Sequence, residues 1–289
     1  MRNPKLTAIC TGAILLLVVG ARAQNLFVSE EGGSVLAITP NGTQSTFASV
    51  STPSIIQLAF NGAGDLFVAD EGSHSISEFA PSGVESTFAS VSLSPVFGMA
   101  FNTSGDLFVG ADYNILEFTP GGTESTFASE VYPTGDMAFN SAGDLFVASE
   151  SGITEITPAG VQSFFSNGLG APVGLAFNST GDLFVADAGS GNIYEYTPGG
   201  VRSTFASGLD RPDGLAFNSA GDLFEADAGS GNIYEFSPDG TRSTFASGLN
   251  FPSGLAFQPT PEPSSLWLVL LGGGVWFGLR ARNKTFANP

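Results

Sequence analysis

Short apolar segments alternate with turn-forming residues along most of the chain, in a pattern that predicts strands. The phrase LAF, or a close variant, ends at Phe60, Phe101, Phe139, Phe177, Phe217 and Phe257, with successive differences of 41, 38, 38, 40 and 40 residues. A period of about 40 residues fits a propeller blade or a helical array. Because Gly and Pro interrupt every copy, no apolar stripe with the 3.6-residue period of a helix survives. The pattern therefore predicts six copies of a β-rich unit.

Each unit divides into four expected strands. In the copy that spans residues 174–209 these are GLAF, LFVAD, NIYEY and VRSTFAS, joined by short segments rich in Gly, Asn and Pro. The first two strands are apolar on both faces, which suits a sheet packed between two neighbouring sheets. We therefore predict an all-β, six-bladed β-propeller with four antiparallel strands per blade. Phe184, Phe205 and Phe217, with their repeats, are expected to fill the layers between blades.

The ends of the repeat region predict how the ring closes. The region opens at Leu26 with a second strand and finishes at residues 254–257 with a first strand. We expect these N- and C-terminal strands to share the closing blade, because pairing them removes two open sheet edges. The propeller is then expected to span residues 24–260.

Charge narrows the choice of partners. Residues 24–260 hold three Arg, no Lys and 26 of the 27 acids, so their formal charge is 3 − 26 = −23. Such a surface repels phosphate backbones, which excludes nucleic acid as a partner. Calcium ions, cationic polymers and simple colloidal solubility all remain compatible with it.

The N-terminal segment, residues 1–23, has the features of a secretory signal peptide. Arg2 and Lys5 precede an apolar stretch over residues 6–20, and the small residues that signal peptidase recognises are Ala21 and Ala23. The single cysteine lies inside this segment. Cleavage after Ala23 would leave a protein without disulfides or a thiol nucleophile.

The C-terminal segment, residues 261–289, has the features of a second targeting signal. Its parts are Pro261, Glu262 and Pro263, an apolar run over residues 266–279, and a basic tail with Arg280 and Arg282. As a transmembrane helix the run would be short, about 21 Å against a hydrocarbon core of about 30 Å. The arrangement resembles the PEP-CTERM sorting signal. That resemblance implies transient membrane anchoring, processing by an exosortase, and delivery to the cell envelope or extracellular matrix. An ordinary tail anchor is the alternative.

The repeat itself also resembles a known family. The phrase P-x-G-L-A-F-N-x-x-G-D-L-F-V-A-D is similar to the NHL repeat over almost all of residues 24–257. It also looks like the six-bladed propellers of the gluconolactonase and senescence-marker family, and more distantly like the streptogramin lyases. This resemblance is specific for the fold and unspecific for the function.

The gluconolactonase resemblance implies one candidate metal ligand in the central channel. Those enzymes hold a divalent cation with carboxylate and amide oxygens, and their aspartate stands in a PDG phrase that Pro212, Asp213 and Gly214 match. The expected asparagine one blade earlier is replaced by Val173, which leaves Asp213 as a lone carboxylate. The histidine base of the streptogramin lyases has no clear counterpart, since His74 is the only histidine and lies in a loop.

The ends of the second strands offer a wider acidic set. Its members are Glu30, Asp70, Asp187 and Asp227, with Asp112 and Glu150 one residue later in their copies. They could gather calcium at one rim or simply accept hydrogen bonds from the following turns. The aspartates that end the tight hairpins are expected to be structural: Asp65, Asp106, Asp144, Asp182 and Asp222. The repeat region has five tyrosines, of which Tyr194 and Tyr234 recur at one strand position and are expected to pack.

The sequence therefore favours an exported, non-catalytic binding or scaffold propeller. Its expected partner is an extracellular polymer or a surface protein, with signal peptidase and exosortase as partners during export. The alternative is a calcium-dependent lactone hydrolase or lyase of the gluconolactonase type. Calcium is the one cofactor that the sequence leaves open, with Asp213, Asp187, Asp227 and Asp70 as its candidate ligands.

Overall fold

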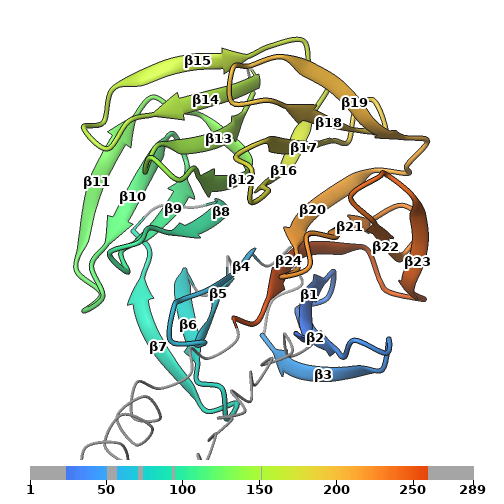
Figure 1. Ribbon diagram of the computed structural model, residues 1–289. Helices are drawn as coiled ribbons and strands as arrows, with labels where there is room; N and C mark the ends of the chain where they lie inside the picture. The colour runs from blue at the N-terminus through green and yellow to red at the C-terminus, as the bar shows by residue number, and fades with distance from the viewer. Residues whose placement is uncertain (1–23, 51–56, 71–73, 93–94, 151, 260–289) are drawn as a thin grey trace, which may run out of the picture.

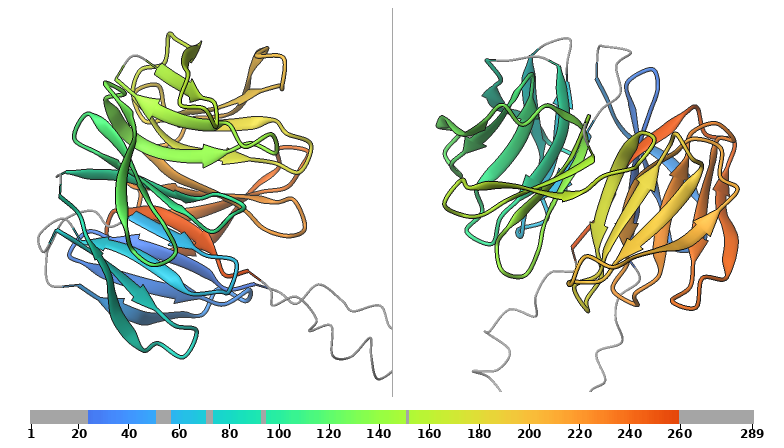
Figure 2. Two further views of the ribbon diagram at one scale, coloured as in Figure 1. Left: turned by 90° about the vertical axis from the view of Figure 1, so that its left-hand side faces the viewer. Right: turned by 90° about the horizontal axis from the view of Figure 1, so that it is seen from above.

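The computed structural model describes residues 24–50, 57–70, 74–92, 95–150 and 152–259. These residues form six four-stranded antiparallel sheets arranged around a central axis (Figure 1). The two side views show the same sheets as twisted blades set side by side around the ring (Figure 2). The predicted six-bladed β-propeller is confirmed.

Three blades follow one another from the first complete repeat. The first holds β4 (Gln57–Phe60), β5 (Leu66–Asp70), β6 (Ser75–Phe79) and β7 (Glu85–Ser90). The second holds β8 (Val96–Phe101), β9 (Leu107–Ala111), β10 (Asn114–Phe118) and β11 (Glu124–Ser129). The third holds β12 (Pro133–Phe139), β13 (Leu145–Ser149), β14 (Gly152–Ile156) and β15 (Gln162–Ser166).

The remaining blades complete the circle. The fourth holds β16 (Pro172–Phe177), β17 (Leu183–Asp187), β18 (Asn192–Tyr196) and β19 (Arg202–Ser207). The fifth holds β20 (Pro212–Phe217), β21 (Leu223–Asp227), β22 (Asn232–Phe236) and β23 (Arg242–Ser247). The sixth holds β24 (Pro252–Phe257), β1 (Leu26–Glu30), β2 (Ser34–Ile38) and β3 (Gln44–Ser49). The first-named strand of each blade is innermost, and these inner strands contact one another all around the ring.

The sixth blade closes the ring in the predicted way. Strand β24, at the end of the repeat region, pairs antiparallel with β1, with Phe257 opposite Leu26 and Leu255 opposite Val28. Its strand order is β24-β1-β2-β3, so residues from both ends of the propeller complete one sheet. This pairing removes the two free edges that an open ring would present to solvent.

Phenylalanine rings join neighbouring blades, as predicted. The ring of Phe184 on β17 packs edge-on against Phe205 of its own blade, with ring centroids 5.0 Å apart. It also packs against Phe217 of the next blade, at 5.1 Å. The same three-ring arrangement recurs at the other five blade junctions. Edge-to-face pairs add about 0.5–1.5 kcal/mol each beyond the area that they bury.

In five of the six blades, the hairpin between the first two strands uses the predicted aspartate structurally. In the fourth blade, the backbone N–H groups of Thr180 and Asp182 donate to Asn178 Oδ1 at 3.0 and 2.8 Å. The side-chain amide of Asn178 donates in turn to Asp182 Oδ2 at 2.9 Å. The same Asn–Asp pairing recurs in four other blades. These acids hold the tight turns.

Two predicted segments lie outside the described residues. They are the signal peptide, residues 1–23, and the sorting segment, residues 261–289, with its expected transmembrane helix at 266–279. Within the described ranges, no helix has the length and apolar character needed to cross a membrane.

Candidate functional site

Asp187, one of the predicted calcium ligands, serves as a structural acceptor. Its side chain is fully buried. The backbone N–H of Gly170 donates to both carboxylate oxygens at 3.0 and 2.9 Å, and the N–H of Ala171 donates to Oδ1 at 2.6 Å. The hydroxyl of Ser190 adds a bond of 2.9 Å. Burial alone would raise the pKa of Asp187, but these hydrogen bonds lower it below its ordinary value.

Asp227 occupies the same place in the next blade. It is 1% exposed and accepts hydrogen bonds from the backbone N–H groups of Asp210 and Ser230 at 2.8 and 3.1 Å. Asp70 ends β5 at the matching position and is also buried. The turn interpretation therefore accounts for the contacts of Asp187 and Asp227. In the described part of the chain, no three His, Cys, Asp or Glu side chains come close enough together to hold a metal ion.

Asp213, the channel ligand implied by resemblance, lies on the inner strand β20 and is half-buried. Burial raises the pKa of Asp213 to about 6, although the nearby Arg211 lowers it. A second acid accompanies it. Asp136 lies on the inner strand β12, two blades away, and burial raises its pKa to about 7, while the backbone N–H of Met137 lowers it and the charge of Asp213 raises it further. The prediction of a lone channel carboxylate was therefore wrong.

A one-residue insertion explains why Asp136 was missed. On β20, Pro212 pairs with Asp227 and Leu215 pairs with Glu225, so two residues lie between the two paired positions. On β12, the matching positions are Pro133 and Met137, which pair with Ser149 and Val147, and three residues lie between them. Four positions before the repeated Phe lie Asp213 in the fifth blade and Gly135 in the third. An alignment on that Phe therefore compares Asp213 with Gly135 and misses Asp136. The insertion is absorbed by an irregularity in the β12–β13 register.

A third unusual acid, Glu225, sits inside the wall between two blades. It replaces the valine found in the middle of the other five second strands: Val28, Val68, Val109, Val147 and Val185. Its side chain is fully buried, and neither carboxylate oxygen has a hydrogen-bond partner. Burial raises the pKa of Glu225 to about 9, the charges of Asp227 and Asp213 raise it further, and Arg242 lowers it. Glu225 therefore carries a proton at neutral pH.

A small pocket opens on the face of the propeller where the connections between blades enter the inner strands. Its volume is about 240 Å³, and it is lined by Pro95, Phe97, Asp112, Tyr113, Tyr132, Pro133, Thr134 and Glu150. We call this the rim pocket. Tyr113 and Tyr132 are 55% and 45% exposed, and their ring centroids lie 5.0 Å apart. Both belong to the five tyrosines of the repeat region, but no pattern in the sequence indicates that they lie together.

The other tyrosines and the histidine behave as expected. Tyr194 and Tyr234 pack against the cores between blades, and the guanidinium groups of Arg202 and Arg242 stack over their rings at 5.0 and 4.8 Å. His74 is exposed in its turn.

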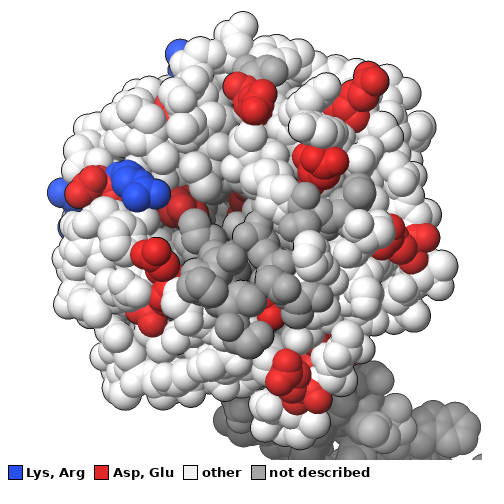
Figure 3. All heavy atoms as spheres, turned by 180° about the vertical axis from the view of Figure 1, so that it is seen from behind, with Lys and Arg blue, Asp and Glu red and all other residues white. Residues whose placement is uncertain are grey.

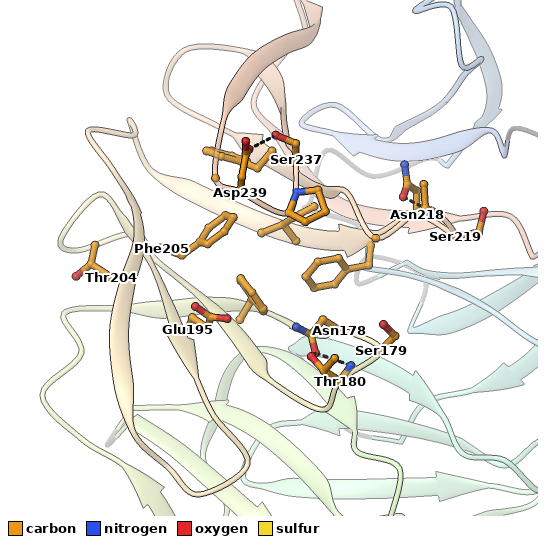
Figure 4. Close-up of a pocket in the computed structure, with 18 residues that line it drawn as sticks. Asn178, Ser179, Thr180, Glu195, Thr204, Phe205, Asn218, Ser219, Ser237 and Asp239 are labelled. Atoms are coloured by element: carbon orange, nitrogen blue, oxygen red, sulfur yellow. Dashed lines mark hydrogen bonds between the residues drawn. The ribbon is translucent and has the colours of Figure 1, made fainter.

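A larger cavity of about 720 Å³ lies between the fourth and fifth blades (Figure 4). It is lined by the hairpins that follow the first and third strands, so it opens on the face opposite the rim pocket. Many of its polar groups already serve their own turns: Asn178 and Thr180 bond to each other, and the Ser237 hydroxyl donates to Asp239 at 2.6 Å. Its walls are repeat residues, so it is a gap in regular inter-blade packing.

The charge of the surface matches its sequence. Figure 3 shows one face of the molecule, with Asp and Glu spread around the ring and basic atoms visible only at its left and upper left edges. Among the described residues, the arginines lie in the fourth and fifth blades and in the connection between them: Arg202, Arg242 and Arg211. The rim pocket, built on the second and third blades, has no cation in its lining.

Comparison with known proteins shows a shared fold at low sequence identity. No protein-family model matches the chain, and no curated protein sequence is similar to it. A chain in the crystal structure of a nidogen/laminin complex aligns with 18% identity and a TM-score of 0.73, over 82% of this chain and 98% of that one. A streptogramin B lyase structure aligns with 17% identity and a TM-score of 0.64, over 83% of this chain and 88% of that one.

A third solved structure is that of a protein of unknown function from Bacteroides caccae. It aligns with 16% identity and a TM-score of 0.65, over 82% of this chain and all of that one. The class that these likenesses define is the six-bladed β-propeller, whose members include both binding proteins and lyases. Function must therefore be argued from the chain's own site.

Proposed function

We propose that the chain is an exported, non-catalytic binding propeller of the cell envelope or extracellular matrix. The observation that carries this proposal is the rim pocket, where two exposed tyrosines stand together on the propeller face. Loops on the face of a rigid scaffold are the usual place for recognition. Exposed aromatic side chains of this kind are enriched in binding surfaces, since they offer a large contact area at little entropic cost.

The rim pocket also lies where the repeat is least regular. Three non-glycine residues in or beside it have left-handed backbone: Asp112, Glu130 and Tyr132, with φ of 54°, 63° and 55°. Such conformations cost about 1–3 kcal/mol each and tend to cluster at functional positions. The matching positions of the fourth and fifth blades are left-handed as well: Gly208 and Gly248 match Glu130, and Arg211 and Phe251 match Tyr132. What departs from the repeat is the turn at Asp112, where those blades carry the longer sequence DAGSGN, together with the side chains of Glu130 and Tyr132. This departure supports a selected binding surface here.

The proposed location rests on the two ends of the sequence. A signal peptide at residues 1–23 and a PEP-CTERM signal at residues 261–289 would export the chain and hand it to an exosortase. Changing Pro261, Glu262 and Pro263 to alanine should leave unprocessed chain in the membrane fraction. If the wild type and this alanine variant are processed equally, as measured by the mass of the C-terminal peptide, sorting by this motif is contradicted.

Binding itself is tested with extracellular polymer from the cells that make the protein. Full-length protein should sediment with this insoluble material, and the double variant Tyr113→Ala/Tyr132→Asn should stay in solution. Asparagine is chosen at Tyr132 because it tolerates left-handed backbone. Phe164→Ala is the matched control, since Phe164 is 53% exposed and lies on β15, outside the rim pocket. Equal retention of the double variant, Phe164→Ala and the wild type would contradict the proposal.

One observation favours the enzymatic alternative, a calcium-dependent lactone hydrolase or lyase. Asp136 and Asp213 lie on two inner strands of the ring, burial raises the pKa of both, and the charge of Asp213 raises the pKa of Asp136 further. Paired carboxyls with shifted pKa values are typical of acid–base sites. If this function holds, calcium-dependent lactone hydrolysis should vanish in Asp213→Asn and persist in Tyr113→Ala. The binding proposal expects no such hydrolysis in either protein.

A further inference from the structure

The two tyrosines of the rim pocket come from different blades. Tyr113 lies in the turn between β9 and β10, and Tyr132 lies in the connection that leads into β12. Their rings meet at an angle of 58° with centroids 5.0 Å apart, and about half of each side chain is exposed to solvent. The result is a shallow aromatic corner and not a closed cage.

The backbone around this corner is tied down by hydrogen bonds. The N–H of Val131 donates to the carbonyl oxygen of Tyr113 at 3.1 Å, and the N–H of Asp112 donates to that of Pro95 at 3.1 Å. The N–H of Glu150 donates to the carbonyl oxygen of Tyr132 at 3.4 Å. Four loops, two of them connections between blades, are therefore linked to one another by these bonds. A site held in this way is arranged before its ligand arrives, which lowers the entropic cost of binding.

The polar groups of the pocket select for a cation. Asp112 and Glu150 are the two charged residues of its lining. Carboxylates accept short, strong hydrogen bonds from ammonium groups, and the electron-rich faces of tyrosine also attract cations. The propeller segment has a formal charge of −23, from three Arg and 26 acids in residues 24–260, which favours the approach of a polycation.

The size and openness of the pocket narrow the ligand further. About 240 Å³ lies just below the range of about 300–1,000 Å³ typical of sites that enclose a drug-sized molecule, so it suits one unit of a longer chain. The open corner offers flat faces against which the C–H groups of a sugar ring can pack. A narrow aromatic cage would be needed to enclose a bare ammonium group instead.

We propose that the rim pocket binds one 2-amino-2-deoxyhexose unit of a cationic, de-N-acetylated polysaccharide. The sugar ring stacks on the Tyr113–Tyr132 corner, and its ammonium group donates hydrogen bonds to Asp112 and Glu150. This inference rests on the proposed binding function and names its ligand class. The polymer fits a protein of the envelope or matrix, where it would meet the acidic face of the propeller.

The test is calorimetric titration of full-length protein with a glucosamine hexamer, an N-acetylglucosamine hexamer and a lysine hexamer. The glucosamine hexamer should bind, and its affinity should fall about tenfold in Tyr113→Ala and about tenfold in Glu150→Gln, since one stacking contact or one charged hydrogen bond is removed. The acetylated hexamer, whose nitrogen carries no charge, should bind at least about tenfold more weakly. Phe164→Ala and Glu31→Gln, which alter an exposed aromatic and an exposed acid elsewhere, should bind like the wild type.

Four results would overturn the inference. Equal affinity in all variants would mean that net charge alone attracts the polymer. Equally tight binding of the lysine hexamer through the same residues would mean that the pocket recognises an ammonium group without a sugar. Absence of glucosamine binding, with retention on extracellular polymer still dependent on Tyr113 and Tyr132, would remove the ligand class and leave the binding function standing. Loss of both glucosamine binding and retention on extracellular polymer would remove the ligand class and the binding function together. Circular dichroism of each variant excludes unfolding as the cause.

Discussion

Replacing Glu225 with valine should make the propeller markedly more stable at neutral pH. Valine stands at this position in the other five blades, so the change restores the regular packing of the second strand. Because side chains alternate along a strand, Glu225 shares its face with Leu223, which packs with Phe184 and Ala186 of the preceding blade. The carboxyl is therefore held in an apolar layer, without a hydrogen-bond partner for either oxygen.

The size of the effect follows from proton linkage. Burial, with the charges of Asp227 and Asp213, raises the pKa of Glu225 from 4.5 to about 9. At pH 7, about 2.5 pH units above the ordinary value, folding must take up a proton at a cost of about 1.4 kcal/mol per pH unit, or about 3 kcal/mol in total. Glu225→Val removes this cost and adds the burial of an apolar side chain, so it should stabilise by about 3 kcal/mol or more.

The dependence on pH gives a sharper test than the stability at one pH. In the native state Glu225 keeps its proton up to about pH 9, whereas the unfolded chain loses it near pH 4.5. The stability therefore falls as pH rises through this window and is unaffected by this group below it. Asp136 and Asp213 act with the same sign, up to about pH 7 and about pH 6. Comparison with Glu225→Gln, which cannot ionise, isolates the part due to Glu225.

The assay is urea unfolding of full-length protein followed by circular dichroism at pH 5, 7 and 9. The difference in unfolding free energy between Glu225→Gln and the wild type should grow by about 1.4 kcal/mol per pH unit across this range. Glu31→Gln, at an exposed acid, should follow the wild type throughout. Parallel pH profiles for Glu225→Gln and the wild type would refute the reasoning, since they would mean that Glu225 is not protonated by folding.

Three further changes test the fold and the metal question. Phe184→Ala should lower the free energy of unfolding in urea by about 3–5 kcal/mol, because it removes an aromatic ring that packs between two blades. Phe164→Ala, at an exposed ring, should lower it by almost nothing, and an equally small loss for Phe184→Ala would contradict this packing. Truncation before about residue 250 removes β24 and should lower the melting temperature of the whole ring. An unchanged melting temperature would show that the pairing of β24 with β1 does not stabilise the ring. Melting curves in EDTA and in millimolar Ca²⁺ should coincide, because the carboxylates of Asp187 and Asp227 already accept backbone hydrogen bonds, and a large upward shift would show a real metal site.

The fold could be predicted from the sequence because each blade repeats the same physical solution. The position of Phe217 in every copy set the period, and the second strand's apolar residues on both faces required a neighbour on each side. The closing pair of β24 and β1 followed from which strand each end supplies. Repetition made these inferences strong, since six copies had to agree.

The site could be predicted only in part, because its residues break the repeat. Asp136 enters through a single inserted residue, which alignment to the repeated Phe conceals. Tyr113 and Tyr132 come from different loops, and no pattern in the sequence indicates that their rings meet. Glu225 was visible as an exception among the valines, but only the structure shows that its oxygens lack partners. Departures from a repeat are the positions where sequence reasoning has the fewest copies to compare.

Retention on extracellular polymer is the measurement that bears most directly on the proposed function. Full-length wild-type protein and Phe164→Ala should sediment with polymer from the cells that make the protein, and Tyr113→Ala/Tyr132→Asn should remain soluble while staying folded. Equal retention of the double variant would show that the rim pocket is not the binding surface. If neither protein were retained, and lactone hydrolysis depended on Asp213 and Ca²⁺, the propeller would be an enzyme.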